Sequence, residues 1–170
     1  MLASITPPTR VRPGAFAPMA RFQILRHPTF PVLYVRFTGD VTGADFIAAL
    51  NGTYASPLRQ EGDASVWDLT DVGAVVVDLP EVHALNAQGQ MLAQSQPPGL
   101  IVIVAPQPDV YALARLYGYH AARSGRIIEV VRSRTAAWRR LGVPEPDYGA
   151  LRSLINPAPR YETNGAGRRA

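Results

Sequence analysis

The sequence predicts an α/β fold, with a mostly parallel sheet of five strands and an antiparallel strand at its N-terminal edge. Strand-like and helix-like segments alternate from about residue 21 to residue 142, in the order ββαβαβαβα. Within that stretch, residues 100–105 (LIVIVA) form an uninterrupted apolar run, which is typical of a strand buried on both faces of a parallel sheet. Strand–helix–strand units of this length favour right-handed crossovers, which keep the strands parallel.

The first two predicted strands form a hairpin. Residues 22–26 alternate between apolar and polar side chains, residues 27–31 contain two prolines, and residues 32–38 form the second extended run. A short break between two such runs predicts antiparallel pairing. Three further strands are expected over residues 64–69, 100–105 and 126–131.

Four helices are predicted from their first residues. Thr42 and Asp45 form a capping-box pattern, and Asp78 precedes a proline in the first turn of the second helix. Pro108 opens the third helix, which runs to about residue 123. The fourth begins after Ser133 and ends at Gly142.

The two ends of the chain have a different composition. Residues 1–20 are rich in proline and have no apolar period, and residues 143–170 combine prolines with a glycine-rich end. We therefore expect a disordered N-terminal tail over 1–20, an α/β domain over 21–142, and a Pro/Gly-rich C-terminal tail over 143–170. Within that tail, residues 148–155 have the composition of a helical turn that docks on the domain.

Composition excludes several classes of protein. The 170 residues are 47% hydrophobic and 18% charged, enough apolar material for a buried core. Cysteine is absent, which excludes disulfides and thiolate chemistry. No apolar run is long enough to cross a bilayer, and the N-terminus has no signal-peptide core, so we expect a cytoplasmic protein.

The charges are unevenly distributed along the chain. Residues 40–81 carry eight acidic side chains against one arginine, whereas residues 115–140 carry seven arginines against one glutamate. Two oppositely charged halves can attract each other within one fold or in a homodimer. A nucleic-acid site would need the arginines on one face together with aromatic residues or on a groove-entering helix, and we do not expect nucleic-acid binding.

Two segments carry a resemblance to a known family. Residues 104–117 (VAPQPDVYALARLY) and 130–142 (VVRSRTAAWRRLG) resemble the STAS-like family of short bacterial proteins of unknown function. That family is related in fold to anti-sigma-factor antagonists and is grouped with the CRAL-TRIO lipid-carrier domains. The segment Trp67-Asp68-Leu69 is similar to the family's central strand, and the order of elements matches over about 21–142. The resemblance implies the fold rather than a particular chemistry.

The resemblance also allows one regulatory mechanism to be checked. In anti-sigma-factor antagonists, a phosphorylatable serine follows an aspartate just before the second helix. Asp78 matches that aspartate, but Leu79 occupies the position of the hydroxyl, and the nearest alternative, Thr70, lies about one loop away. We therefore expect no phosphoserine switch.

The usual catalytic patterns are missing. His27, His83 and His120 fall in three different predicted elements and show no i, i+4 spacing, so no metal site is expected. The sequence has neither a Gly-x-Ser-x-Gly elbow nor a phosphate-binding glycine loop, and we expect no cofactor. Asp40 ends the hairpin strand and Asp68 lies near the end of the 64–69 strand, at the sheet edge where α/β folds bind ligands, but such acids also commonly cap turns.

The third predicted helix carries a stripe at i, i+4 and i+8. Tyr111, Arg115 and Tyr119 lie on one face of it. This composition is typical of an interface centre, and also of a solvated face with an ordinary arginine–tyrosine pair. We expect a homodimer formed through this helix or through an adjoining sheet edge.

Two functions of different classes follow. The first is a non-enzymatic STAS-like binding or regulatory module for a protein partner or a small lipid-like, apolar or anionic ligand, without the serine switch. The second is a small enzyme that uses the acids at the sheet edge. The residues expected to matter are Tyr111, Arg115, Tyr119, Asp40 and Asp68.

Overall fold

A computed structural model describes residues 21–57 and 59–153 of the chain. Its elements are β1 (Phe22–Arg26), β2 (Val32–Thr42), α1 (Gly43–Ala55), β3 (Ala64–Val76), α2 (Leu79–Ser95), β4 (Ile101–Val104), α3 (Pro108–Ala122), β5 (Ile128–Val131), α4 (Arg134–Leu141), the 3-10 turn η1 (Tyr148–Ala150) and β6 (Arg152–Ser153). The predicted tail over 1–20 and residues 154–170 of the predicted C-terminal tail lie outside the described residues.

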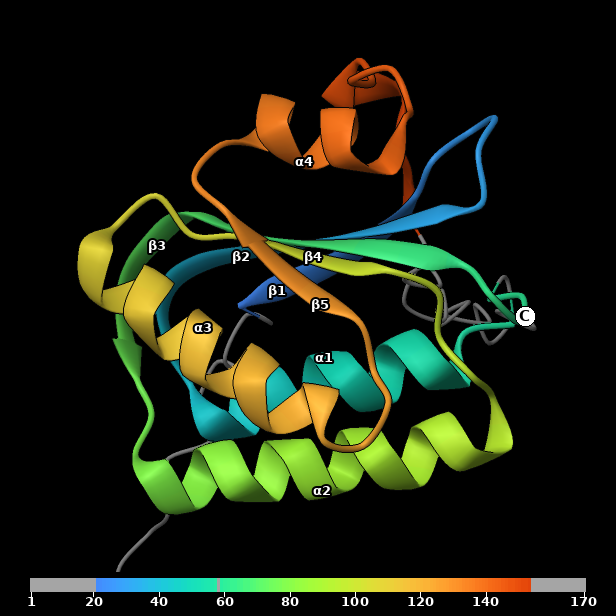
Figure 1. The fold of residues 1–170 in the computed structure, drawn as a ribbon. Helices are drawn as coiled ribbons and strands as arrows, with labels where there is room; N and C mark the ends of the chain where they lie inside the picture. The colour runs from blue at the N-terminus through green and yellow to red at the C-terminus, as the bar shows by residue number, and fades with distance from the viewer. Residues whose placement is uncertain (1–20, 58, 154–170) are drawn as a thin grey trace, which may run out of the picture.

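The strands form one sheet in the order β5-β4-β3-β2-β1-β6. β2, β3, β4 and β5 are parallel to one another, and β1 is antiparallel to β2. Helices α1, α2 and α3 cover one face of this sheet, while α4 lies on the other (Figure 1). The predicted α/β class, with five strands in the order ββαβαβαβα, is confirmed.

The helices begin where capping predicts. The Thr42 and Asp45 side chains each accept from the other's backbone N–H, and Asp78 and Glu81 repeat this arrangement at the start of α2. Ser133 caps α4, and Gly142 ends it in the left-handed conformation with φ of 66°. Asp78 is therefore occupied as a helix cap.

The structure extends the predicted strands in two places. β2 continues to Thr42 and β3 to Val76, because the two strands go on pairing through two register shifts beyond Arg36. β6 adds two residues outside β1, within the segment assigned to the C-terminal tail. Leu151 explains this addition, since its side chain is buried in the core beneath α4.

Two hydrophobic clusters fill the space on either side of the sheet. The larger one lies against α1, α2 and α3, and the smaller one is centred on Trp138 of α4. Successive residues of a strand point to opposite faces, so β3 supplies both clusters. Among the described helices, none is long and apolar enough to cross a membrane.

Candidate functional site: a polar network and an apolar cavity

Two neighbouring residues at the centre of the sheet define the two candidate sites. Trp67 and Asp68 follow each other on β3, so their side chains point to opposite faces. The Asp68 side chain is fully buried beneath α4, and Trp67, 8% exposed, belongs to the cluster beneath α1, α2 and α3. One strand thereby places a charge on one face and an indole on the other.

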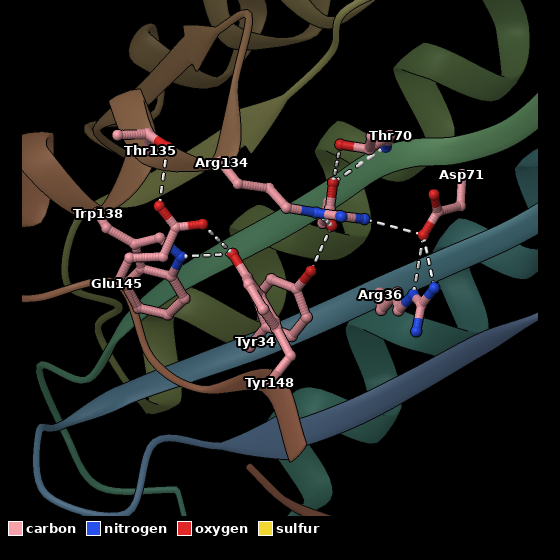
Figure 2. Close-up of polar contacts among 10 residues, drawn as sticks. Tyr34, Arg36, Thr70, Asp71, Arg134, Thr135, Trp138, Glu145 and Tyr148 are labelled. Atoms are coloured by element: carbon pink, nitrogen blue, oxygen red, sulfur yellow. Dashed lines mark hydrogen bonds and ion pairs between the residues drawn. The ribbon is translucent and has the colours of Figure 1, made fainter. Parts of the chain in front are cut away.

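Asp68 is the centre of a polar network. Figure 2 labels its partners Tyr34, Thr70 and Arg134. Its carboxylate accepts a hydrogen bond from the Tyr34 hydroxyl and one of 2.6 Å from Arg134 Nε. The backbone N–H of Thr70 donates at 3.0 Å, and the Thr70 hydroxyl donates to the same oxygen. Both carboxylate oxygens are thus occupied by donors, which is what a buried charge requires.

The network extends to the surface through Asp71. Arg36 and Arg134 both approach the same Asp71 oxygen, at 2.7 Å and 2.8 Å. Burial alone would raise the pKa of Asp71, but the hydrogen bonds from these two guanidinium groups outweigh it and lower the pKa. Burial, followed by the hydrogen bond to Asp68, raises the pKa of Tyr34 above its usual value. The lowered pKa favours the ionised form of Asp71, and the raised pKa favours the neutral form of Tyr34.

A second layer of the network surrounds Tyr148. Its hydroxyl accepts from Trp138 Nε1 at 3.0 Å and donates to Glu145 at 2.9 Å, and Thr135 donates to the other Glu145 oxygen (Figure 2). Burial, together with the hydrogen bond to Glu145, raises the pKa of Tyr148 to about 12. This layer attaches the segment after α4 to the helix itself.

The opposite face of the sheet contains a small apolar cavity. Its volume is about 50 Å³, and it lies between the sheet and helices α2 and α3. It is lined by Phe46, Trp67, Leu69, Val75, Val77, Val82, Leu85, Ile103, Val110, Leu113, Ala114 and Tyr117. The buried Nε1 of Trp67 has no hydrogen-bond partner within the described part of the chain. A buried polar group of this kind requires an explanation, such as a bound molecule.

Arg59 is the other residue with buried unbonded side-chain nitrogens, at Nε and Nη2, among those that the structure describes. Its guanidinium lies 4.0 Å from the centre of the Tyr54 ring, so a cation–π contact compensates part of its burial. Arg59 does not line the apolar cavity. The Trp67 indole therefore combines an unbonded donor with an adjoining space, and Arg59 does not.

The two predicted acids do not form one site. Asp68 lies opposite Arg36 in the register, whereas Asp40 is four residues further along β2, roughly 13 Å away at the usual strand rise. Asp40 is also exposed, while Asp68 is enclosed by donors. The structure therefore keeps apart the two carboxylates on which the enzyme hypothesis depends.

The predicted stripe on α3 divides into two parts. Tyr111 is half-buried, and the Arg132 guanidinium lies 4.0 Å from the centre of its ring. Arg115 and Tyr119 instead line a surface groove with Gly118 and three residues of β5. Since β5 is the last of the described strands in the sheet, this part of the stripe borders a strand edge that no other described strand pairs with.

Sequence reasoning missed three groups that the fold brings together. Arg134 and Tyr34 come from distant elements to bond Asp68, and only the topology puts them there. The alternation of side chains along β3 places Trp67 on the face opposite Asp68, and this signal could have assigned it to a second site. His83 and His120, assigned to separate elements, face each other across α2 and α3.

Comparison with known proteins gives a likeness of fold. An uncharacterised protein of the DUF3478 family with a SpoIIAA-like fold, from Shewanella loihica, is 11% identical, with 75% of this chain and 99% of that chain covered and a TM-score of 0.46. The anti-sigma factor antagonist SpoIIAA in its unphosphorylated form is 14% identical, with 72% and 99% covered and a TM-score of 0.41.

The Bacillus cell fate determinant SpoIIAA in its phosphorylated form is 13% identical, with 71% and 98% covered and a TM-score of 0.41. No family model matches the chain, and no curated protein sequence does. These matches are likenesses of fold at low sequence identity.

Proposed function

We propose that this protein is a cytoplasmic, non-enzymatic binding module whose apolar cavity takes a small, largely apolar molecule with one hydrogen-bond acceptor. One observation carries the proposal: the buried Trp67 Nε1–H has no partner among the residues that the structure describes, and it belongs to a side chain that lines the cavity. The remaining lining is almost entirely aliphatic or aromatic. An apolar pocket with one polar group that fixes orientation is the usual form of a small-molecule site.

The energetics favour a ligand that carries an acceptor. A buried donor without a partner costs about 1 to 3 kcal/mol, and an acceptor on a bound molecule removes that cost. The apolar part of the ligand adds roughly 25 cal/mol for each Å² removed from water. A hydrocarbon of the same shape gains only the second contribution, so the site should distinguish the two.

The size of the cavity limits what can bind without a rearrangement. A volume of about 50 Å³ is far below the roughly 300 to 1,000 Å³ of pockets that hold drug-sized molecules. The ligand is therefore either a fragment of a few heavy atoms, or a longer molecule whose entry moves α2 away from α3. Val82 and Leu85 on α2 and Val110 and Ala114 on α3 are the walls that would separate.

The opposite face supports binding over catalysis. The Asp68 carboxylate already accepts from Tyr34, Thr70 and Arg134, so no lone pair faces an open site. Asp40 lies too far along β2 to act with it. We therefore prefer the binding module to the small enzyme that the acids suggested.

The module we propose has no phosphoserine switch. Leu79 is the first residue of α2, and its side chain is 54% exposed at the position where the switch would need a hydroxyl. The Thr70 hydroxyl is held by Asp68. Incubation with an anti-sigma-factor type kinase should leave the loop before α2 without phosphate, and phosphate on Thr70 would contradict this part of the proposal.

The binding proposal can be tested with a matched pair of probes. Cyclohexanone and methylenecyclohexane have the same shape, but only the first carries a strong acceptor. Saturation-transfer NMR on the full chain should show both binding, with the ketone tighter by about tenfold if it bonds the indole N–H. The variant Trp67→Phe should bind both probes equally, because it keeps an aromatic ring and loses the donor.

A second variant tests the place of binding. Ala114→Leu puts a larger side chain into the cavity, and Ala112→Leu makes the same change at an exposed position of α3. The first should abolish binding of both probes, and the second should leave it unchanged. Equal binding by Ala114→Leu and wild type would show that the cavity is not the site.

A further inference from the structure

Two histidines from different helices meet on the surface of the protein. His83 on α2 and His120 on α3 lie 37 positions apart in the sequence, yet their ring centroids are 4.9 Å apart with the planes inclined at 50°. Both line a groove with Asn86, Ala87, Gln90, Arg123 and Ser124. The pair lies at the surface, apart from the apolar cavity, with which this groove shares no lining residue.

We propose that His83 and His120 form a binding site for a late first-row divalent cation such as Zn²⁺, Ni²⁺ or Cu²⁺. A tetrahedral or octahedral ion about 2.1 Å from one nitrogen of each ring places the two centroids roughly 4.5 to 5.3 Å apart. The observed separation falls within that interval. Imidazole nitrogen is a preferred ligand of these ions, whereas Mg²⁺ and Ca²⁺ prefer oxygen.

The ring nitrogens are available for coordination. Within the part of the chain that the structure describes, no hydrogen bond holds either imidazole, and His120 has only an edge contact with the Tyr119 ring. The buried His27 differs, because its Nδ1 accepts from the backbone N–H groups of Thr29 and Phe30. A metal that selects free imidazoles should therefore bind the pair and leave His27 alone.

The groove defines the rest of the coordination shell. Gln90 lies two turns after His83 and offers an amide oxygen as a third ligand, while Asn86 is already bonded to Arg126 and to the Val82 carbonyl. No cluster of three His, Cys, Asp or Glu side chains occurs in the described residues, so water completes the shell. Arg123 lines the same groove, and its positive charge opposes a bound cation.

The test uses the full chain without a polyhistidine tag, because a tag would bind the same ions. Calorimetric titration with Zn²⁺ and with Ni²⁺ should show one site per chain, and Mg²⁺ should show none. His83→Ala and His120→Ala should each weaken binding by about a hundredfold, because the second ligand then no longer acts intramolecularly. Arg123→Ala should strengthen binding, since it removes the opposing charge.

Paramagnetic broadening shows which rings hold the ion. Substoichiometric Ni²⁺ should broaden the imidazole proton signals of His83 and His120 together and leave those of His27 sharp. Two results would overturn the proposal. One is a wild-type affinity no tighter than that of either single-histidine variant, and the other is broadening that is centred elsewhere and leaves both of these rings sharp.

Discussion

The two faces of the central sheet differ in how their buried polar groups are bonded. Beneath α4, the buried Asp68 is surrounded by donors, and the nearby Trp138 indole donates to Tyr148. Beneath α2 and α3, the Trp67 indole N–H has no partner in the described chain, and the Trp67 side chain lines a cavity. Two tryptophans of the same protein are therefore both buried, but only one is satisfied.

This difference separates a face with a fully bonded polar network from a face with an unbonded donor. A fully bonded polar network holds its elements in one arrangement, while an unbonded donor next to an empty volume lowers stability without a structural benefit. We infer that the α4 face serves the fold and that the α2–α3 face serves binding. The following predictions test the two halves of that statement.

The largest effect is expected at the centre of the network. Asp68→Ala removes the acceptor of the buried Tyr34 hydroxyl and leaves Arg134 only its more exposed partner Asp71. This loss should cost about 3 kcal/mol in the free energy of unfolding. Asp71→Ala, the matched control in the more exposed pair, should cost less than about 1 kcal/mol. Urea unfolding of both variants measures the difference. Equal costs would show that the buried network is not what holds α4.

A second prediction concerns the edge of the sheet at β5. Arg115 and Tyr119, which is 67% exposed, border the free edge of β5, and this edge is where we expect a homodimer. Tyr119→Ala should weaken self-association by about 1 to 2 kcal/mol if Tyr119 is central to the contact. Sedimentation of both proteins over a concentration series measures this. A wild type that stays monomeric at high micromolar concentration would contradict it, and the stripe would then be a solvated face.

The two tryptophans allow a direct comparison of the faces. Trp138→Phe removes an N–H that bonds the Tyr148 hydroxyl, which keeps only its bond to Glu145, while Trp67→Phe removes an unbonded N–H and a similar ring volume. Trp138→Phe should therefore cost about 1 kcal/mol more in the free energy of unfolding. Chemical denaturation monitored by circular dichroism avoids relying on the fluorescence of the mutated residues. A larger cost for Trp67→Phe would mean that its N–H is bonded in solution.

The smallest effect is a dependence on pH. Hydrogen bonds from Arg36 and Arg134 lower the pKa of Asp71 despite its partial burial, so folding favours its ionised form. That contribution is fully present above the unfolded value of about 3.9 and is lost as the pH falls through the lower folded value. The stability gap between wild type and Asp71→Asn should thus be larger at pH 6 than at pH 2.5. Asp40→Asn provides an exposed control, and a gap that does not change with pH would remove Asp71 from the network.

Local patterns predicted most of the fold. The capping residues Thr42, Asp78 and Ser133 fixed the starts of three helices, and the apolar run at 100–105 identified a buried strand. The extension of β3 to Val76 was missed, because pairing with β2 continues through bulges that leave no clear period. β6 was missed because two residues carry no pattern of their own, and their pairing with β1 joins segments far apart in the sequence.

The candidate sites were less predictable because they depend on contacts between distant elements. Asp68 was identified as a strand-end acid, but its partner Arg134 lies 66 residues away and is placed by α4. The His83–His120 pair likewise depends on how α2 packs on α3. The unbonded state of Trp67 Nε1 follows from what surrounds it, which no local pattern in β3 encodes.

The indole resonance of Trp67 gives the most direct test of the central claim. In a ¹H–¹⁵N spectrum, titration with cyclohexanone should shift the Trp67 Nε1–H signal downfield, because the ketone oxygen accepts its proton. The Trp138 signal should stay in place, since that N–H is already bonded to Tyr148. Methylenecyclohexane should produce no downfield shift. A Trp67 signal that does not respond to the ketone, or that moves only as much as that of Trp138, would contradict the account.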